Sequence, residues 1–290
     1  MSAVVALLPD GRLHLQHGPI DCLCRAWGSP DEIQVAYCQA SGFFGSVLGQ
    51  LCDELPVLRA ALPTPPPTGA VARAMHAACM PFANRFITSM AAVAGAVADA
   101  VLAAMVEGRD LSRAFVNNGG DIAFHLAPGT SLRCGIVTDL ANVSLDGAFL
   151  LTAEQPARGL ATSGRACKGH GGRSFSFGIA DSVTVLARTA AQADAAATML
   201  GNAVDLPGHP AIGRRPASEI DPASDLGCRL ITFDVGPLDD DAIEAALDAG
   251  QAMADTMLRD DLILGAVLSL RHRVRVRNRH TEALLTLEPA

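Results

Sequence analysis

The sequence predicts an α+β fold, in which strands and helices follow one another in mixed order within one compact unit. Short runs rich in β-branched residues, such as SVTVLA at 182–187, predict strands. An apolar run at 86–106 is long enough for a buried helix. Thr189 and Gln192 have the spacing of a capping box, which predicts that another helix begins at about residue 190.

The composition predicts one large domain with an aliphatic core. Half of the 290 residues are hydrophobic but only 4% are aromatic, so Ala, Val, Leu and Ile must fill most of the interior. The run PTPPPTG at 63–69 suits neither a helix nor a central strand, because proline lacks a backbone N–H. We therefore expect a single domain over residues 1–290, with a surface connector at 63–69.

The net charge and the N-terminal segment limit which partners and which location are expected. A formal charge of −8 argues against a nucleic-acid partner, since phosphate binding depends on Lys and Arg, and it favours a small-molecule ligand. The N-terminus has no basic leader and too short an apolar run for a signal peptide, so a cytoplasmic protein is expected. The run at 86–106 is long enough to cross a membrane, but Asp99 interrupts it, which favours a buried helix and no membrane.

The eight cysteines include no CxxC pair, which argues against a zinc knuckle or a disulfide framework. Cys22 and Cys24 form a CxC that could bind a metal ion. Alternate cysteines on a strand are more often small buried apolar residues, and this is the interpretation we favour.

The remaining elements follow from local patterns of apolar, turn-forming and charged residues. Three acids at 239–241 predict the first turn of a helix, because they complement its dipole. Strands are expected at 3–8, 12–16, 32–37, 114–117, 122–126, 132–137, 148–153, 174–178 and 228–235, and helices at 44–58, 86–106 and 190–204.

The C-terminal run LRHRVRVRNR at 270–279 predicts a strand with arginines on one face. These arginines could pair with acids of a neighbouring subunit, hold an anion, or form a solvated face that protects an edge strand. The solvated face is the default interpretation.

Asp194 and Thr198 are four residues apart on the helix after Thr189, so a carboxylate and a hydroxyl project from one helical face. Two hard oxygens in this arrangement suit Mg²⁺, which substrate phosphates and water would complete. The alternative is an exposed Asp and a Thr bonded back to its own helix.

Two glycine-rich segments could also contact a ligand. The run LATSGRACKGHGGR at 160–173 combines glycines with basic residues and could hold an anion, although glycine clusters also mark flexible hairpins. The run NNGGD at 117–121 offers amides for hydrogen bonding and glycines that let a planar ligand approach the backbone. Asn-Gly and Gly-Gly also form ordinary turns, so this alternative stays open.

The order of these motifs resembles that of the ApbE family of FAD:protein FMN transferases. A strand ends in GGD, a TSG turn follows, then a strand with SVTV, and then a helix with ADxxxT. The resemblance covers residues 84–205. In the segments FITSMAAVAGAVAD, VNNGGDIA and SFSFGIADSVTV the chain looks most like the shorter, uncharacterised ApbE-like branch.

The resemblance implies an ApbE-like fold, with Mg and FAD as the cofactors. It assigns Mg²⁺ binding to Asp194 and Thr198, with the backbone carbonyl near Ala94 as a further ligand. It also implies a flavin site along the two glycine-containing turns, for which the candidates are Asn117, Asn118, Gly119, Gly120, Asp121, Thr162, Ser163, Gly164 and Arg165.

Two positions depart from the family pattern. The family's lysine before the second glycine of the Gly-Ala helix motif is replaced by Ala94, and its HIIDPxTG segment by SFSFGIAD at 174–181. The resemblance implies a flavin or nucleotide binder that acts as an FMN transferase or FAD pyrophosphatase. A non-catalytic flavin binder and an enzyme acting on an unrelated anionic substrate are the alternatives. A homodimer is expected from the apolar composition and possible edge strands.

Overall fold

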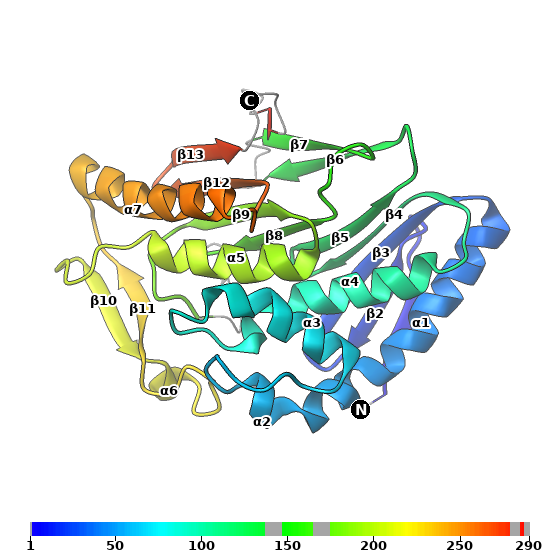
Figure 1. The fold of residues 1–290 in the computed structure, drawn as a ribbon, viewed down its shortest axis with the longest axis horizontal. Coiled ribbons are helices and arrows are strands. Elements are labelled where there is room, and N and C mark those ends of the chain that lie inside the picture. Colours follow the sequence, from blue (N-terminus) through cyan, green and yellow to red (C-terminus); the bar gives the residue numbers. More distant parts are fainter. Residues whose placement is uncertain (1, 137–146, 165–174, 279–284, 287–290) are drawn as a thin grey trace. The chain divides into compact units, whose positions relative to one another are not determined.

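The computed structural model describes residues 2–136, 147–164, 175–278 and 285–286, and it confirms the α+β class (Figure 1). The described chain forms two compact units. The first comprises Met1–Arg133, Leu150–Ala161 and Leu186–Ala195, and the second comprises Cys134–Phe149, Thr162–Val185 and Ala196–Ala290. Both units draw on several segments, so no single cut separates them, and one domain over 1–290 stays a prediction.

The first unit contains an antiparallel sheet with helices packed on it. Its strand order is β1-β2-β3-β4-β5-β8, and α1 and α4 contact the sheet and each other. Alternate side chains of β2, β3 and β4, including Leu15, Cys22 and Ala114, are fully buried. The strands are β1 (Val4–Leu7), β2 (Leu13–His17), β3 (Ile20–Gly28), β4 (Leu111–Asn118), β5 (Asp121–Leu126), the start of β6 (Ser131–Ile136), the end of β7 (Gly147–Thr152) and the start of β8 (Gly159–Ser163). The helices are α1 (Pro30–Asp53), α2 (Leu55–Leu58), α3 (Ala70–Cys79), η1 (Met80–Phe82), η2 (Ser89–Ala92) and α4 (Val93–Val106).

The strand expected at 32–37 is wrong, because this segment lies in the first turns of α1. Ser29 caps that helix by accepting a hydrogen bond from the N–H of Glu32 at 3.3 Å, and Pro30 occupies its first position. Ala36, Ala40 and Phe44 then recur at helical spacing and are fully buried. The helix expected at 44–58 therefore begins fourteen residues earlier and ends at Asp53.

The apolar run at 86–106 forms a 3-10 turn, η2, and then α4. The segment Ser89–Val106 is long and apolar enough to cross a membrane by length and composition alone, and half of it is buried inside the protein. α4 contacts α1, α3, β4 and β5. The expectation of a buried helix agrees with these contacts.

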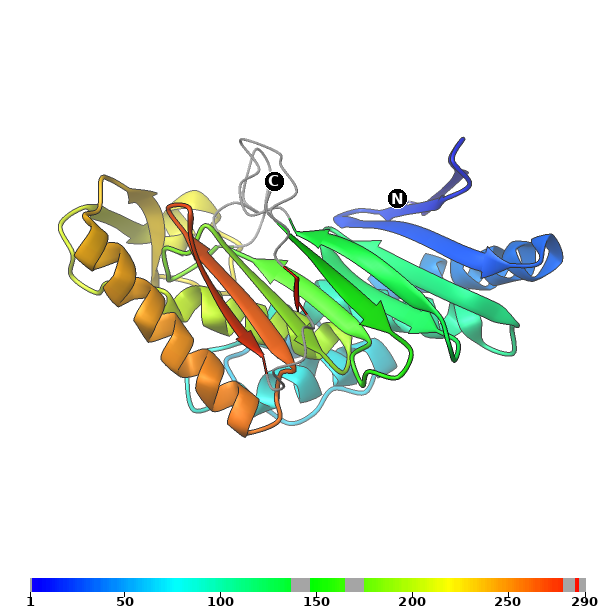
Figure 2. The same ribbon diagram turned by 90° about the horizontal axis from the view of Figure 1, so that it is seen from above.

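The second unit contains strands in the order β9-β12-β13, a separate two-stranded ribbon of β10 and β11, and α7, which lies along β12 and β13 (Figure 2). β9 (Ser182–Ala187) matches the expected strand, but 175–178 is not a strand, and residue 174 lies outside the described residues. The further elements are the end of α5 (Ala190–Ala203), whose residues 190–195 belong to the first unit, β10 (Ile212–Pro216), α6 (Ala217–Ile220), β11 (Leu230–Val235), α7 (Asp240–Arg259), β12 (Gly265–Leu270), β13 (Arg273–Asn278) and β14 (Leu285–Thr286).

Two predicted helix starts are confirmed by their caps. The side chain of Thr189 accepts a hydrogen bond from the N–H of Gln192 at 3.2 Å, and α5 begins at Ala190. The side chain of Asp239 accepts one from the N–H of Ala242 at 2.8 Å, directly before α7.

The C-terminal arginines pair with acids of α7, so a wholly solvated face is the wrong interpretation. Arg275 pairs with Glu244, and Arg277 lies 2.6 Å from Asp255. Arg273 contacts Glu244 at 3.3 Å as well as Asp240 at 2.9 Å. Arg271 does not share this face, because it forms the β12–β13 turn with a φ of 50°, and residue 279 lies outside the described residues.

Candidate functional site

Two aspartates of the first unit hold the N-termini of α4 and α5 reciprocally. Asp99, on α4, accepts hydrogen bonds from the N–H groups of Ala190 and Ala191, each at 2.9 Å. Asp194, on α5, accepts one from the N–H of Gly95 at 3.0 Å. A helix N-terminus presents unpaired N–H groups and a partial positive charge. Each carboxylate therefore stabilises the start of the helix that carries the other.

Glycines permit the close approach of these backbones. A Cβ atom on Gly95 would lie 2.2 Å from the carbonyl oxygen of Ala190, and one on Gly159 would lie 2.1 Å from the nitrogen of the same residue. Neither distance is compatible with a side chain. The two glycines thus allow α4 and β8 to pack against the start of α5.

Burial raises the pKa of both carboxyl groups. The pKa of Asp99 rises to about 6, although the hydrogen bonds from Ala191 and Ala190 oppose the change. Burial also raises the pKa of Asp194, and the neighbouring charge of Asp99 adds to this effect, against the hydrogen bonds from Gly95 and Ala94. The backbone N–H groups thus compensate the buried negative charge incompletely.

Ala94, Asn118 and Asp194, three of the residues singled out from the sequence, lie together in the first unit. The side chain of Asn118, only 7% exposed, donates a hydrogen bond to the carbonyl oxygen of Ala94 at 3.1 Å. The Asn118 amide oxygen accepts one from the N–H of Asp21 at 3.4 Å. The carbonyl of Ala94, in the first turn of α4, is thus fixed by the Asn118 side chain.

Thr198 lies one helical turn beyond Asp194 on α5, and both side chains are partly buried. Thr198 belongs to the second unit. Within the described residues no group of three or more His, Cys, Asp or Glu side chains could hold a metal ion. The first unit offers the Asp194 carboxylate and the Ala94 carbonyl as oxygen donors, and Thr198 stays a predicted ligand.

The NNGGD motif forms the turn between β4 and β5. Asn118 pairs with Asp121, and Gly119 and Gly120 between them have φ values of 67° and 109°. The side chain of Asn117 accepts a hydrogen bond from the N–H of Gly120 at 2.8 Å. A Cβ atom on either glycine would meet nothing within 4 Å among the described residues, so the backbone of this turn is accessible.

The TSG motif lies in the second unit, where Thr162 and Ser163 end β8 and Gly164 follows directly. The hydroxyls of Thr162 and Thr184 are 2.9 Å apart, and Ser163 lies over Gly201 of α5. Gly164 has a φ of 129° and packs closely on the backbone at Asp181. Arg165, predicted to contact flavin, lies outside the described residues, as do Lys168, His170 and Arg173.

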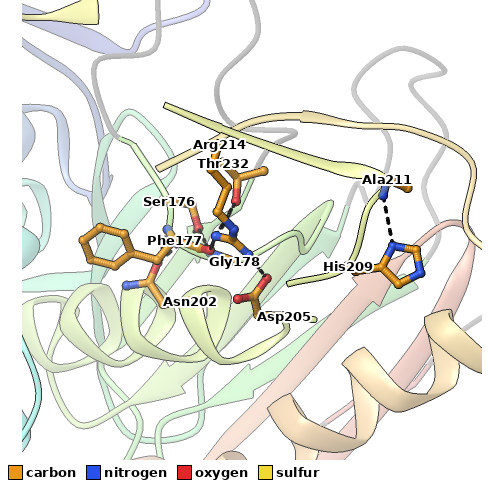
Figure 3. Close-up of polar contacts among 9 residues, drawn as sticks. All are labelled: Ser176, Phe177, Gly178, Asn202, Asp205, His209, Ala211, Arg214 and Thr232. Atoms are coloured by element: carbon orange, nitrogen blue, oxygen red, sulfur yellow. Dashed lines mark hydrogen bonds and ion pairs between the residues drawn. The ribbon is translucent and has the colours of Figure 1, made fainter. Parts of the chain in front are cut away.

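The segment that replaces the family's HIIDPxTG motif is held by side-chain hydrogen bonds (Figure 3). The amide oxygen of Asn202 accepts hydrogen bonds from the Ser176 hydroxyl at 3.1 Å and the Phe177 N–H at 2.9 Å. Arg214 donates to the carbonyl of Phe177 and pairs with Asp205 at 2.5 Å. These contacts explain why the expected strand is absent, because the N–H of Phe177 bonds to a side chain instead of a neighbouring strand.

Sequence reasoning missed the structural role of Asp99, and it took Asn118 only as a flavin contact. The signal for Asp99 was visible in the sequence, because it is the only charged residue in the apolar run at 86–106. Cys22 and Cys24 are fully buried, as expected for apolar positions. Burial raises the pKa of Cys24 to about 12, which disfavours metal binding by its thiolate.

Comparison with known proteins assigns the family. A family model described as "AbpE bacteria" matches residues 5–276, so the chain belongs to this ApbE-like family. The UPF0280 protein of Methanococcus vannielii is 39% identical over 121 residues, which are 41% of this chain and 46% of that protein. The UPF0280 protein of Methanoregula boonei is 36% identical over 140 residues, 48% of this chain and 56% of that protein. The chain thus matches about half of the length of these curated relatives.

Among solved structures, the apo form of the flavinyl transferase ApbE of Pseudomonas stutzeri is similar with a TM-score of 0.45 and 13% identity. That match covers 96% of this chain and 95% of the other. The ApbE protein of Thermotoga maritima has a TM-score of 0.36 and 12% identity, over 88% of this chain and 78% of the other.

Proposed function

We propose that this protein binds a flavin nucleotide together with Mg²⁺ and cleaves FAD to FMN and AMP. The observation that carries the proposal is the position of the Asp194 carboxylate at the N-terminus of α4, directly beside the Ala94 backbone. Membership of an ApbE-like family supports it.

The oxygens near Asp194 suit a magnesium ion. The Asp194 carboxylate accepts hydrogen bonds from the N–H groups of Gly95 and Ala94, and a carboxylate has further lone pairs that can bind a cation. The Ala94 carbonyl and the Thr198 hydroxyl are further hard donors. Because burial raises the pKa of Asp194, a bound cation would relieve an incompletely compensated charge. Three protein ligands leave coordination positions for water and for the substrate's phosphates.

The flavin would contact the two glycine-containing turns. The backbone of Gly119 and Gly120 lies on an accessible hairpin, where the N–H of Gly120 donates to the Asn117 side chain and Asp121 follows directly. Thr162, Ser163, Gly164 and Arg165 are the proposed contacts in the other segment. Backbone N–H groups and small residues of this kind let a planar ring or a phosphate approach closely.

The chemistry consists of breaking one phosphoanhydride bond. The magnesium ion, when bound, supplies positive charge that stabilises the pyrophosphate as that bond breaks. Asp194 orients its ligand oxygens because Gly95 and Ala94 hold its carboxylate, and Asn118 holds the Ala94 carbonyl. A protein Thr or Ser hydroxyl accepts FMN in a transferase, whereas water accepts it in a pyrophosphatase. AMP is the leaving group in both.

A flavin binder without catalysis is the second candidate, and two observations favour it. Ala94 replaces the family's lysine, and Ser176 and Phe177, in place of the HIIDPxTG motif, bond to Asn202 and Arg214. A third candidate, an enzyme for another anionic substrate, predicts no flavin binding.

The test is FAD binding by fluorescence quenching with and without Mg²⁺, followed by chromatography of the incubated flavin. We expect Mg²⁺-dependent binding and the appearance of FMN and AMP. Intact FAD after binding would establish the non-catalytic binder, and no binding at all would refute a flavin function.

The Asp194→Ala variant tests the metal site. It should weaken the Mg²⁺-dependent step by on the order of 100-fold or more, since metal stabilisation of charge amounts to several kcal/mol. Asp248→Ala, which removes an exposed carboxylate of α7, is the matched control and should behave as wild type. Full activity of Asp194→Ala would contradict the site.

A further inference from the structure

The central strands of the first unit have helices packed on one face. α1 contacts β3 and α4 contacts β4, and alternate side chains of these strands, such as Cys22, Cys24 and Val116, are fully buried. The opposite face of β3 and β4 carries no described helix of this unit (Figure 2). The side chains on that face are only partly buried, so core packing does not account for the residue types found there.

Two arginines and two aromatic side chains lie together on this open face. Trp27 pairs with Arg113 across the two strands, and Arg25 pairs with Phe115 in the same register. The guanidinium carbons of Arg25 and Arg113 lie 5.0 Å and 4.7 Å from the centre of the Trp27 ring. The centres of the Trp27 and Phe115 rings are 5.9 Å apart. We call these four residues the β3–β4 cluster.

The β3–β4 cluster lies where the cover of this face ends. Phe124 of β5 pairs with Phe115, and Leu126 pairs with Arg113, so these residues share one face of the sheet. Phe124 is 2% exposed and Leu126 is 5% exposed, whereas their partners on β4 are only partly buried. The apolar surface of β5 thus continues into a part of the sheet that the described residues leave partly open.

The two guanidinium groups of the β3–β4 cluster form no ion pair with an acid among the described residues. Arg113 donates a hydrogen bond to the carbonyl oxygen of Ser131 at 3.3 Å. Asp10 and Asp21, the acids of the neighbouring turn and strand, lie 2.7 Å and 2.8 Å from basic side chains outside the cluster. A guanidinium has five N–H donors, so Arg25 and Arg113 keep donors for an external acceptor.

Stacking on Trp27 prepares both guanidinium groups to bind carboxylates. A guanidinium over an indole ring keeps its planar edge free, and this edge matches the two oxygens of a carboxylate. The ring already restricts the long side chains, so less conformational entropy is lost when hydrogen bonds form. Phe115, and Leu23 two residues before Arg25 on the same face, add partly exposed apolar surface.

The size and composition of the β3–β4 cluster suit a short segment of a protein. Neighbouring positions on one face lie roughly 7 Å apart along a strand and roughly 5 Å apart across strands, so the cluster has the length of a few extended residues. Tryptophan and arginine are the side chains that most often dominate the binding energy of protein interfaces. A nucleic acid would need a longer basic groove, and the net charge of −8 argues against one.

We propose that the β3–β4 cluster docks an extended acidic segment of a partner protein, with carboxylates on Arg25 and Arg113 and an apolar side chain on Phe115. The contact is small, so the complex forms and dissociates rapidly. This inference does not depend on the proposed function.

The first test uses Trp27, the only tryptophan of the chain, as a fluorescent probe of the cluster. In the full-length protein, iodide should quench its emission readily, because the guanidinium groups attract anions. The ratio of iodide to caesium quenching should fall by about twofold in the double variant Arg25→Gln, Arg113→Gln. Arg215→Gln, which removes an exposed arginine stacked on Phe233, is the matched control and should leave the ratio unchanged. A Trp27 that neither ion reaches would overturn the proposal.

The second test is the binding of a dye-labelled peptide of four glutamates around a central leucine, followed by fluorescence anisotropy in a buffer without divalent cations. We expect saturable binding that salt weakens, and affinity on the order of tenfold lower for the double variant. Arg215→Gln should bind as wild type, and so should Asp194→Ala, which separates this surface from the proposed metal site. Circular dichroism should show that all variants remain folded.

A peptide with glutamine in place of each glutamate is the control for charge and should not bind. Equal binding of the two peptides, no saturable binding of the acidic one, or an affinity that the double variant leaves unchanged would overturn the proposal. Tighter binding of a single-stranded oligonucleotide, lost in the double variant, would also overturn it and assign the surface to nucleic acid.

Discussion

The carboxylates of the two units have different partners: backbone N–H groups in the first unit and arginines in the second. In the first unit, Asp99 and Asp194 are partly buried and bond to backbone N–H groups, without an arginine or lysine among the bonds that hold them. In the second unit, Glu244 and Asp255 of α7 are also partly buried, but they pair with arginines of β13. Burial raises the pKa of the first pair, whereas the second pair has its counter-charges in place. An incompletely compensated charge is available to a ligand, and a paired one mainly serves packing.

The largest loss of stability is expected when a side chain is added where α4 and α5 pack most closely, beside Asp99 and Asp194. Gly95→Ala would place a Cβ atom 2.2 Å from the Ala190 carbonyl oxygen, so α4 and α5 must separate. We expect a loss of about 3 kcal/mol in the free energy of unfolding, because overpacking against rigid backbone is costly. Urea denaturation followed by circular dichroism measures it.

Ala103→Ser, at an exposed position of the same helix, is the control and should change stability by no more than about 0.5 kcal/mol. Equal stability of Gly95→Ala and this control would show that the two helices are not so closely packed.

The titration of Asp99 is expected to change the free energy of unfolding by up to a similar amount, spread over a range of pH. Because the pKa of its carboxyl rises from 3.8 to about 6 on folding, the native state binds more protons than the unfolded state between these values. Its contribution to stability is therefore complete below about pH 4 and is lost as pH rises through 6, by up to about 3 kcal/mol.

Asp99→Asn removes this titration but keeps an oxygen that can accept one of the two N–H groups. The stability of wild type minus that of Asp99→Asn should fall between pH 4 and pH 7, measured by urea denaturation in the presence of a chelator. A difference that is constant across this range would rule out the raised pKa.

The smallest effect is expected in the second unit. Glu244 contacts both Arg273 and Arg275, yet Arg273 is 45% exposed and Glu244 is 34% exposed. Exposed ion pairs contribute about 0–1 kcal/mol and are screened by salt. Glu244→Gln should therefore lower the free energy of unfolding by less than about 1 kcal/mol. Repeating the denaturation at high salt should reduce the difference further, and an effect that salt leaves unchanged would contradict simple pairing.

Local patterns predicted the elements whose ends carry their own signals. The caps at Thr189 and Asp239 place the starts of α5 and α7 correctly, because a cap involves residues only three apart. The segment 32–37 was wrongly predicted as a strand, because apolar residues over a few positions suit a strand as well as a helix. Ser29 and Pro30 were the signals that decide between them.

By itself, the sequence determined the class of fold, the family resemblance and the identity of Asp194 and Ala94 as candidate ligands. The order of the motifs and the helical spacing of short segments are properties of the chain alone. Only the tertiary structure brought Asp99 to the start of α5, Asn118 to the Ala94 carbonyl and the C-terminal arginines to α7. Each of these contacts joins residues 22 or more positions apart, and such pairings depend on how whole elements pack.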